Sequence, residues 1–138
     1  LARANAGSGG YPGTLSMDEP THAYHRRTGV PVVAYSSQAG GFFSGKYAAD
    51  DDPAAVANQG IVRTYYHESN FQRLARAQAL AARHGRTANE ANLAYLRSQP
   101  FAVIPIVGSR TVAQVEASCA ATGWHLTPEE CRWLESGD

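Results

Sequence analysis

The sequence predicts an α/β protein with parallel strands. Two short apolar runs, at 30–35 and 102–107, are rich in β-branched residues and typical of strands buried in a parallel sheet. A glycine-containing loop follows each run, and segments with apolar residues at helical spacing lie between the runs and after them. Strands that alternate with helices in this way favour parallel βα units.

The predicted helices share one start signal, a Ser or Thr followed three residues later by an acidic or amide side chain. The signal recurs as Ser16 and Glu19, Ser69 and Gln72, Thr87 and Glu90, Thr111 and Gln114, and Thr127 and Glu130. With Gly or Pro as stops, these signals predict helices over about 18–28, 69–84, 87–99, 111–121 and 127–135. The residues expected to face inward are Phe71, Leu74, Ala77, Leu80, Ala81, Leu93 and Leu96. We expect residues 48–60 to be exposed and mobile.

Composition limits the classes of partner. The 138 residues fit one domain, and a content of 43% hydrophobic residues is typical of a globular protein. Twelve basic residues balance twelve acidic ones, so charge predicts neither a nucleic acid nor a membrane surface as partner. No apolar run approaches the roughly 20 residues of a membrane span. Cys119 and Cys131 match no metal spacing and are too few for a secreted disulfide framework, which indicates reduced cysteines in a cytoplasmic protein.

Two strands are too few for a stable open parallel sheet, because each strand needs neighbours and cover on both faces. The sequence therefore predicts part of a larger α/β fold. Residues 1–15 are rich in Gly and small residues and begin without Met, so we interpret them as a loop or the remnant of an upstream segment. Residues 16–138 form the predicted structured part.

Both strands end in loops suited to an anionic ligand. The first loop combines polar side chains, adjacent glycines and a lysine: Ser36, Ser37, Gln38, Gly40, Gly41 and Lys46. The second places Gly108, Ser109 and Arg110 directly before a helix start, whose unpaired N–H groups favour anions. The planar Arg guanidinium binds two phosphate oxygens at once. The plain alternative, in which Gly108 is only a turn and Arg110 a solvated charge, stays open.

Other candidate sites are weaker. His22 and His25 lie three residues apart on a predicted helix, a spacing that can share a metal, but no third ligand is near them in the sequence. The acidic run at 50–52 is more typical of a solvated loop than of a cation site. No metal site is therefore predicted. No Ser–His–Asp order or nucleophile elbow indicates a hydrolase.

The stretches VVAYSSQAGGFFSGKY (32–47) and VIPIVGSRTVAQVEAS (103–118) resemble the aldo-keto reductases, the NADP(H)-dependent (β/α)₈-barrel oxidoreductases. The first stretch is similar to the seventh strand of that barrel and its loop, and the second to the eighth strand and its helix. The resemblance extends over about 24–136. It implies the C-terminal portion of a TIM (β/α)₈ barrel, with two parallel strands and their helices.

The resemblance also implies a cofactor site for NADP(H). The nicotinamide and pyrophosphate end would be lined by Tyr35, Ser36, Ser37, Gln38 and Ala39, with Lys46 near the phosphates. The adenosine 2′-phosphate end would be held by Gly108, Ser109 and Arg110, supported by Gln114, and Ser118 would keep one hydrogen bond to the adenine. The sequence departs from the family in Ser37 and Gln38, which replace a common Pro-Leu, and in Ala117 and Ser118, which replace a Glu-Asn pair that holds the adenine. We therefore expect weaker cofactor binding than in a relative with the full pattern.

The implied activity is the NADP(H)-dependent reduction of small aldehydes or ketones to alcohols. No residue here matches the catalytic Asp, Tyr, Lys and His of the family, so no catalytic residue is predicted and we expect the chain alone to be inactive. The alternatives are a non-catalytic NADP-sensing or interaction module of the same fold, and a non-functional truncated product. Uncovered strand edges and apolar side chains predict self-association of the fragment.

Overall fold

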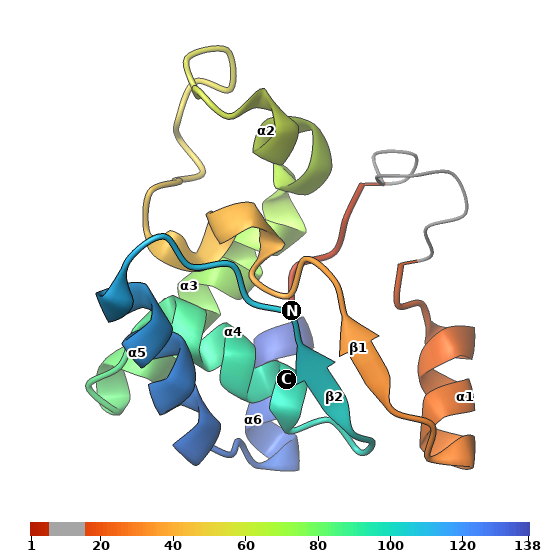
Figure 1. Cartoon of the computed structure of the whole chain (residues 1–138). Coiled ribbons are helices and arrows are strands. Elements are labelled where there is room, and N and C mark those ends of the chain that lie inside the picture. The colour runs from red at the N-terminus through yellow and green to blue at the C-terminus, as the bar shows by residue number, and fades with distance from the viewer. Residues whose placement is uncertain (6–15) are drawn as a thin grey trace.

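The regular structure of the chain consists of two short strands and a larger set of helices. The computed structural model describes residues 1–5 and 16–138. The strands are β1 (Val32–Ala34) and β2 (Val103–Pro105). The α-helices of the described residues are α1 (Glu19–Thr28), α2 (Gln59–Tyr65), α3 (Glu68–Arg83), α4 (Ala88–Arg97), α5 (Val112–Ala120) and α6 (Pro128–Ser136), and the 3₁₀ helices are η1 (Ala39–Ser44) and η2 (Ala121–Gly123) (Figure 1).

β1 and β2 lie side by side as a parallel pair, which confirms the predicted arrangement. The pairs in register are Val32 with Val103, Val33 with Ile104, and Ala34 with Pro105. The connection between the strands runs through η1, α2, α3 and α4, a long crossover of the kind that parallel strands require. Because both strands run in the same direction, the loops that follow them leave the same edge of the sheet (Figure 1).

One face of this sheet is largely exposed. Val33 and Ile104 point to that face, and 60% and 56% of their surfaces are accessible. The neighbouring Val32 and Val103 alternate to the other face and are half-buried, and α4 contacts β2. The strands are therefore partly buried on one face only, and the exposed face carries the uncovered apolar side chains that the sequence predicts for part of a larger fold. Covering it requires further strands or helices, which the described residues do not supply.

Most predicted helix boundaries match the structure. The capping boxes of α4 and α6 are present, with the hydroxyl of the first residue and the carboxylate of the fourth each bonded to the other residue's backbone N–H. Thr111 caps α5 as predicted. Gly29 ends α1 in the left-handed conformation, and Gly85 follows α3 with the same sign of φ. Local capping chemistry therefore predicts these ends from sequence alone.

Two predicted starts are wrong by one or two residues. α1 is capped by Asp18, whose carboxylate accepts a backbone N–H at 2.9 Å, so Ser16 lies outside the helix. α3 already begins at Glu68, and Ser69 lies inside it. The Ser69 hydroxyl bonds to Nδ1 of His67 at 2.9 Å and also accepts from an Arg73 guanidinium, so it is not available as a cap. Asp18 therefore takes the capping position predicted for Ser16, and α3 begins one residue before Ser69, which was predicted to cap it.

Residues 48–60 are largely exposed, as predicted, but a helix that the sequence does not predict begins at their end. The Asn58 side chain caps α2 by accepting the N–H groups of Gly60 and Ile61. Ile61 is 3% exposed and packs into the core. The loop after β1 also contains η1, which places Phe42 and Phe43 in the core. Both short helices are fixed by buried side chains rather than by helical periodicity.

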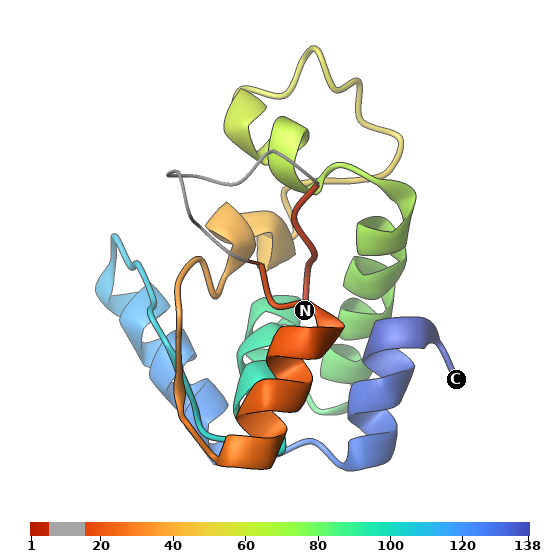
Figure 2. The ribbon, with the colours of Figure 1, turned by 90° about the vertical axis from the view of Figure 1, so that its right-hand side faces the viewer.

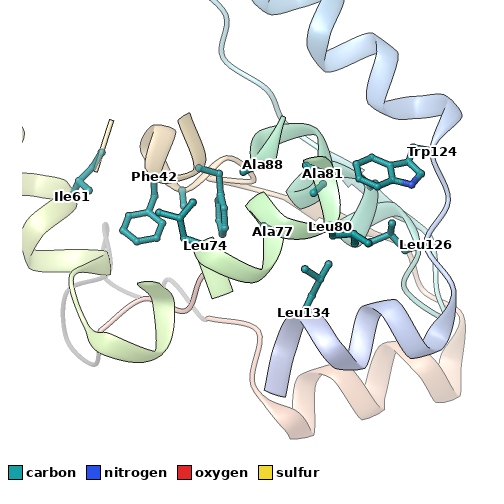
Figure 3. Packing of buried hydrophobic residues seen from close by; sticks show 14 residues of the cluster. Phe42, Ile61, Leu74, Ala77, Leu80, Ala81, Ala88, Trp124, Leu126 and Leu134 are labelled. Carbon is teal, nitrogen blue, oxygen red and sulfur yellow. The ribbon is translucent and has the colours of Figure 1, made fainter. Parts of the chain in front are cut away.

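α3 is the centre of the hydrophobic core. It packs against α4 on one side and α6 on the other, and Figure 3 shows Leu74, Ala77 and Leu80 of α3 among side chains from these elements. The predicted inward positions are buried, apart from Phe71 and Leu96, which are half-buried. The buried apolar cluster contains Ala39, Phe42, Phe43, Ile61, Leu74, Ala77, Leu80, Ala81, Ala88, Ala91, Ala94, Trp124, Leu126 and Leu134.

The first five residues lie against α3 and α2 without regular structure of their own (Figure 2). The Asn70 side chain accepts the Arg3 N–H at 3.0 Å and donates to the Arg3 carbonyl at 2.8 Å. The Asn5 N–H donates to the Thr64 carbonyl at 2.8 Å. The rest of the predicted loop, 6–15, lies outside the described residues. Within the ranges that the structure does describe, no helix has both the length and the apolar character needed to cross a membrane.

Candidate functional site

The candidate site lies at the edge of the sheet where β1 and β2 both end. The loop after β1 leads into η1, and the loop after β2 leads into α5. α4 contacts η1, β2 and α5, so one helix supports both loops. In parallel α/β folds, ligands gather on this side of the sheet. The two loops predicted to bind an anion therefore start from neighbouring positions.

The loop after β1 holds an unusual backbone conformation. Ser36 and Ala39 have φ values of +54° and +50°, in the left-handed region. This conformation costs a residue other than Gly roughly 1–2 kcal/mol. Gly40 and Gly41 follow with φ of +63° and +92°, where glycine avoids that cost. Burial of Phe42, which is 0% exposed, anchors the end of this strained loop in the core.

Ser37 joins this loop to the chain beyond β2. Its side chain is 6% exposed, and its Oγ donates a hydrogen bond to the Ile106 carbonyl at 2.5 Å. Its own carbonyl accepts a hydrogen bond from Nδ2 of Asn92, on α4, at 2.8 Å. Ser37 is thus hydrogen-bonded to the chain beyond β2 through its Oγ and to α4 through its carbonyl, so both of these polar atoms have partners.

Gln38 makes a second connection between the loops. Its Oε1 accepts the Gly108 N–H at 3.3 Å, and its Nε2 lies 3.5 Å from Oδ1 of Asn89, on α4. The structure therefore brings together Ser37, Gln38 and Gly108, which the sequence places in one site. The residues that replace the common Pro-Leu of the family are the ones that form these contacts.

Asn89 and Asn92 were not predicted as site residues. Each contacts the loop after β1, and they lie three residues apart on α4, on one face of the helix. Asn is a poor helix former, because its side chain competes for backbone hydrogen bonds. Two asparagines three residues apart in a predicted helix were therefore a sequence signal that this face of the helix makes hydrogen bonds to another segment.

The loop after β2 presents an uncompensated cation at the start of α5. The Arg110 side chain is exposed, and within the described part of the chain it forms no ion pair. Its backbone N–H donates to Oε1 of Gln114 at 2.7 Å, so Gln114 fixes the backbone of Arg110. A side chain at Gly108 would meet no atom of the described residues within 4 Å, so the space beside it is open. This arrangement suits a phosphate group.

Ser109 and Ser118 line one cavity of about 460 Å³ between β2, α4 and α5. Leu93 and Val115 supply apolar walls to the same cavity. Ser118 is 8% exposed, and its Oγ donates to the Gln114 carbonyl at 2.8 Å. Because its one proton is used inside the helix, the Ser118 hydroxyl is left only as an acceptor for a ligand.

Tyr35 stands at the end of β1 with 71% of its surface exposed, so its ring is free to stack on a planar ligand. Tyr65, at the end of α2, packs against the hydrophobic core. Burial raises the pKa of Tyr65 above its usual value, and the neighbouring Ser36 partly opposes this rise. The Tyr65 hydroxyl is thus protonated at physiological pH.

Lys46 lies apart from the joined residues. It is exposed, directly after Gly45 at the end of η1, and no hydrogen bond of the described residues links it to the loop after β2. The structure therefore groups Ser37, Gln38 and Gly108 without adding Lys46 to the same network.

The two helix-borne histidines serve the packing of α1. His22 and His25 both lie against the Phe101 ring, and Nε2 of His22 is 3.2 Å from Oε1 of Gln99. Nδ1 of His25 is 2.8 Å from the Val30 carbonyl. Among residues 1–5 and 16–138, no three His, Cys, Asp or Glu side chains come together as metal ligands.

Comparison with known proteins identifies the family. The family model described as "Aldo/keto reductase family" matches residues 17–137. Protein tas of Escherichia coli strain K12 is 29% identical over 110 residues, which cover 78% of this chain and 32% of that protein. Aldo-keto reductase AFTS1 of Alternaria alternata is 29% identical over 117 residues, which cover 82% of this chain and 30% of that protein. The chain thus spans about a third of the length of these curated relatives. Because the family match extends over most of the sequence, the chain belongs to the aldo/keto reductase family.

Proposed function

We propose that the chain carries the cofactor-binding part of an NADP(H)-dependent oxidoreductase that reduces small aldehydes or ketones to alcohols. One observation supports this most directly: Ser37 and Gln38 bond to the loop that carries Arg110, so the two predicted halves of the site are held as one unit. The proposal includes a cytoplasmic protein in which this chain forms the C-terminal portion of a TIM (β/α)₈ barrel.

The start of α5 fits the 2′-phosphate of NADP(H). Arg110 is exposed and has no acidic partner in the described ranges, so it can bind a dianion without first breaking an ion pair. Ser109 and the open space beside Gly108 adjoin it. Gln114 would act indirectly, because its side chain already holds the backbone of Arg110. An uncompensated cation at this place favours NADPH over NADH.

The loop after β1 fits the other end of the dinucleotide. The exposed Tyr35 ring would stack on the nicotinamide, and the backbone from Ser36 to Ala39 would face the pyrophosphate. Lys46 would add a positive charge near the phosphates. When bound, NADPH supplies the hydride for carbonyl reduction. The role of the chain's own residues is to bind and orient the dinucleotide.

The adenine end is the weaker part of the proposed site. Ala117 offers no polar side chain, and Ser118 retains only acceptor capacity after donating to Gln114. We therefore propose weaker binding than in relatives with the Glu-Asn pair. No residue of this chain matches the proton donor of the family. The chain alone would therefore bind the cofactor but would not turn over a substrate.

The proposed phosphate contact is tested by Arg110→Ala. Calorimetry should show a loss of NADPH affinity of about 10- to 100-fold, since a hydrogen-bonded charge contributes about 1.5–3 kcal/mol. The affinity for NADH should change less than about twofold, because NADH lacks the phosphate.

Arg132→Ala is the matched control. Arg132 is an exposed arginine on α6 that pairs with Glu129, away from both loops. Arg132→Ala removes one positive charge, as Arg110→Ala does, so any general effect of net charge on affinity appears in both variants. Equal losses for NADPH and NADH in Arg110→Ala would show that Arg110 does not contact the 2′-phosphate.

A further inference from the structure

Asn92 is a buried polar residue in the middle of α4. Its side chain is 0% exposed, and its Nδ2 donates to the Ser37 carbonyl at 2.8 Å. Its Oδ1 has no hydrogen-bond partner among the described residues. A buried amide with an unsatisfied oxygen is costly, so hydrophobic packing does not explain why the helix carries Asn here.

Asn89 lies one turn earlier on the same face of α4. Its Oδ1 lies 3.5 Å from Nε2 of Gln38, whose Oε1 accepts the Gly108 N–H. The two asparagines thus contact consecutive residues of one loop, and each of those residues bonds onward to the loop after β2. The polar path runs from the helix to the first loop and from there to the second.

We propose that Asn89 and Asn92 are positioning residues that set the separation between the two cofactor loops. This inference rests on the proposed function, in which one loop holds the nicotinamide end and the other the 2′-phosphate end. Neither asparagine would touch the cofactor. They act through Ser37 and Gln38, which they hold in place against the sheet edge.

The conformation of the first loop explains why such support is needed. Ser36 and Ala39 adopt positive φ values, a conformation that persists only where surrounding contacts impose it. When the bond from Asn92 to the Ser37 carbonyl is lost, the loop is free to relax and its contacts with Ile106 and Gly108 weaken. Both ends of a dinucleotide must then be bound by loops that are no longer prearranged, which lowers affinity.

This role differs measurably from a general contribution to folding. A ligand that bridges both loops is sensitive to their separation, whereas a ligand that occupies one loop is not. Adenosine 2′,5′-bisphosphate represents the phosphate end alone, and nicotinamide mononucleotide the other end alone. Loss of positioning reduces binding of the whole dinucleotide and leaves each half unchanged.

The test is Asn92→Ala in the 138-residue chain. We expect NADPH affinity to fall about fivefold or more, as for the loss of one buried hydrogen bond, while the affinities of both half-ligands change less than about twofold. Asn89→Ala, at a half-buried position in the first turn of α4, should act in the same direction and keeps the test available if Asn92→Ala does not fold.

The matched control is Asn70→Ala. Asn70 is also 0% exposed and also binds backbone groups, but it lies on α3 and holds Arg3. Asn70→Ala should reduce thermal stability, but it should not lower the affinity for NADPH more than the affinities for the two half-ligands. Equal losses for all three ligands in Asn92→Ala, or no loss for NADPH, would overturn the proposal.

A second readout needs no cofactor. Amide hydrogen exchange at Gly108, whose N–H donates to Gln38, should accelerate about fivefold in Asn92→Ala and Asn89→Ala and stay constant in Asn70→Ala. Unchanged exchange at Gly108 would overturn the coupling of the loops. If exchange changes as expected but the unsubstituted chain binds no NADPH, the proposed function fails and the link between the loops stands.

Discussion

Val33 and Ile104 are cross-strand partners on the exposed face of the sheet, and each leaves more than half of its surface accessible. Tyr35 and Ile106, two residues further along, are 71% and 52% exposed. The sheet therefore presents a contiguous apolar strip that the described residues do not cover. Monomeric proteins rarely leave such strips in contact with water.

We predict that the chain self-associates through this strip. Ile104→Lys should shift the chain toward the monomer, because the charge must then be desolvated in the contact. Sedimentation velocity over a range of protein concentrations measures the shift. Val112→Lys is the control, since Val112 is 74% exposed but lies on α5. A concentration-independent monomer in the unsubstituted chain would contradict the prediction.

We predict that the pure chain gives no NADPH-dependent reduction of a simple aldehyde. The chain would supply the cofactor site and lacks residues that match the proton-donating set of the family. NADPH consumption is followed at its absorbance maximum, with an intact family member as the positive control. Clear turnover would contradict the prediction. A form extended upstream that binds NADPH without turnover would indicate a non-catalytic NADP-sensing module.

We predict that Cys131 stays protonated to unusually high pH. Burial, with smaller contributions from Glu135 and Glu130, raises the pKa of its thiol from 9.0 to about 11. Alkylation by iodoacetamide, resolved by peptide mass spectrometry, should therefore reach half its maximal rate near pH 11 while circular dichroism shows a folded chain. The exposed Cys119 is the internal reference and should react first.

The same shift has a consequence for stability. Because the folded-state pKa lies above the unfolded-state value, the folded chain binds more protons between about pH 9 and 11. The contribution of Cys131 to stability is complete below pH 9 and is lost as the pH rises toward 11. Cys131→Ala should flatten this part of the stability profile in urea denaturation. In the alkylation experiment, a half-maximal rate near pH 9 would show that the pKa of the Cys131 thiol is not raised, and it would contradict both predictions.

Local chemistry accounts for what the sequence predicted well. Thr87 and Thr127 begin capping boxes whose hydrogen bonds close within a single turn, so neighbouring residues suffice to define them. The two apolar runs were long enough to identify strands, and the intervening helices required a parallel crossover. The common edge of the two loops follows directly from that topology.

Contacts between distant segments account for what the sequence did not predict. The bond from Asn92 to Ser37 joins residues 55 positions apart, and neither residue type indicates the other. The inward orientation of Ser118 depends on how α5 packs against α4. The short helix α2 is held by burial of Ile61 and by Tyr65, which packs against the same core, and its seven residues are too few to show a helical repeat in the sequence. The roles of the predicted site residues in binding stay predictions.

Asn70 binds the backbone of Arg3 rather than its side chain. It bonds to both the N–H and the carbonyl of Arg3, and these atoms are the same for every residue except Pro at the donor. Position 3 is therefore free to diverge among descendants of this sequence, provided that it does not become Pro. Position 70 has no such freedom, because few side chains carry a donor and an acceptor in one planar group.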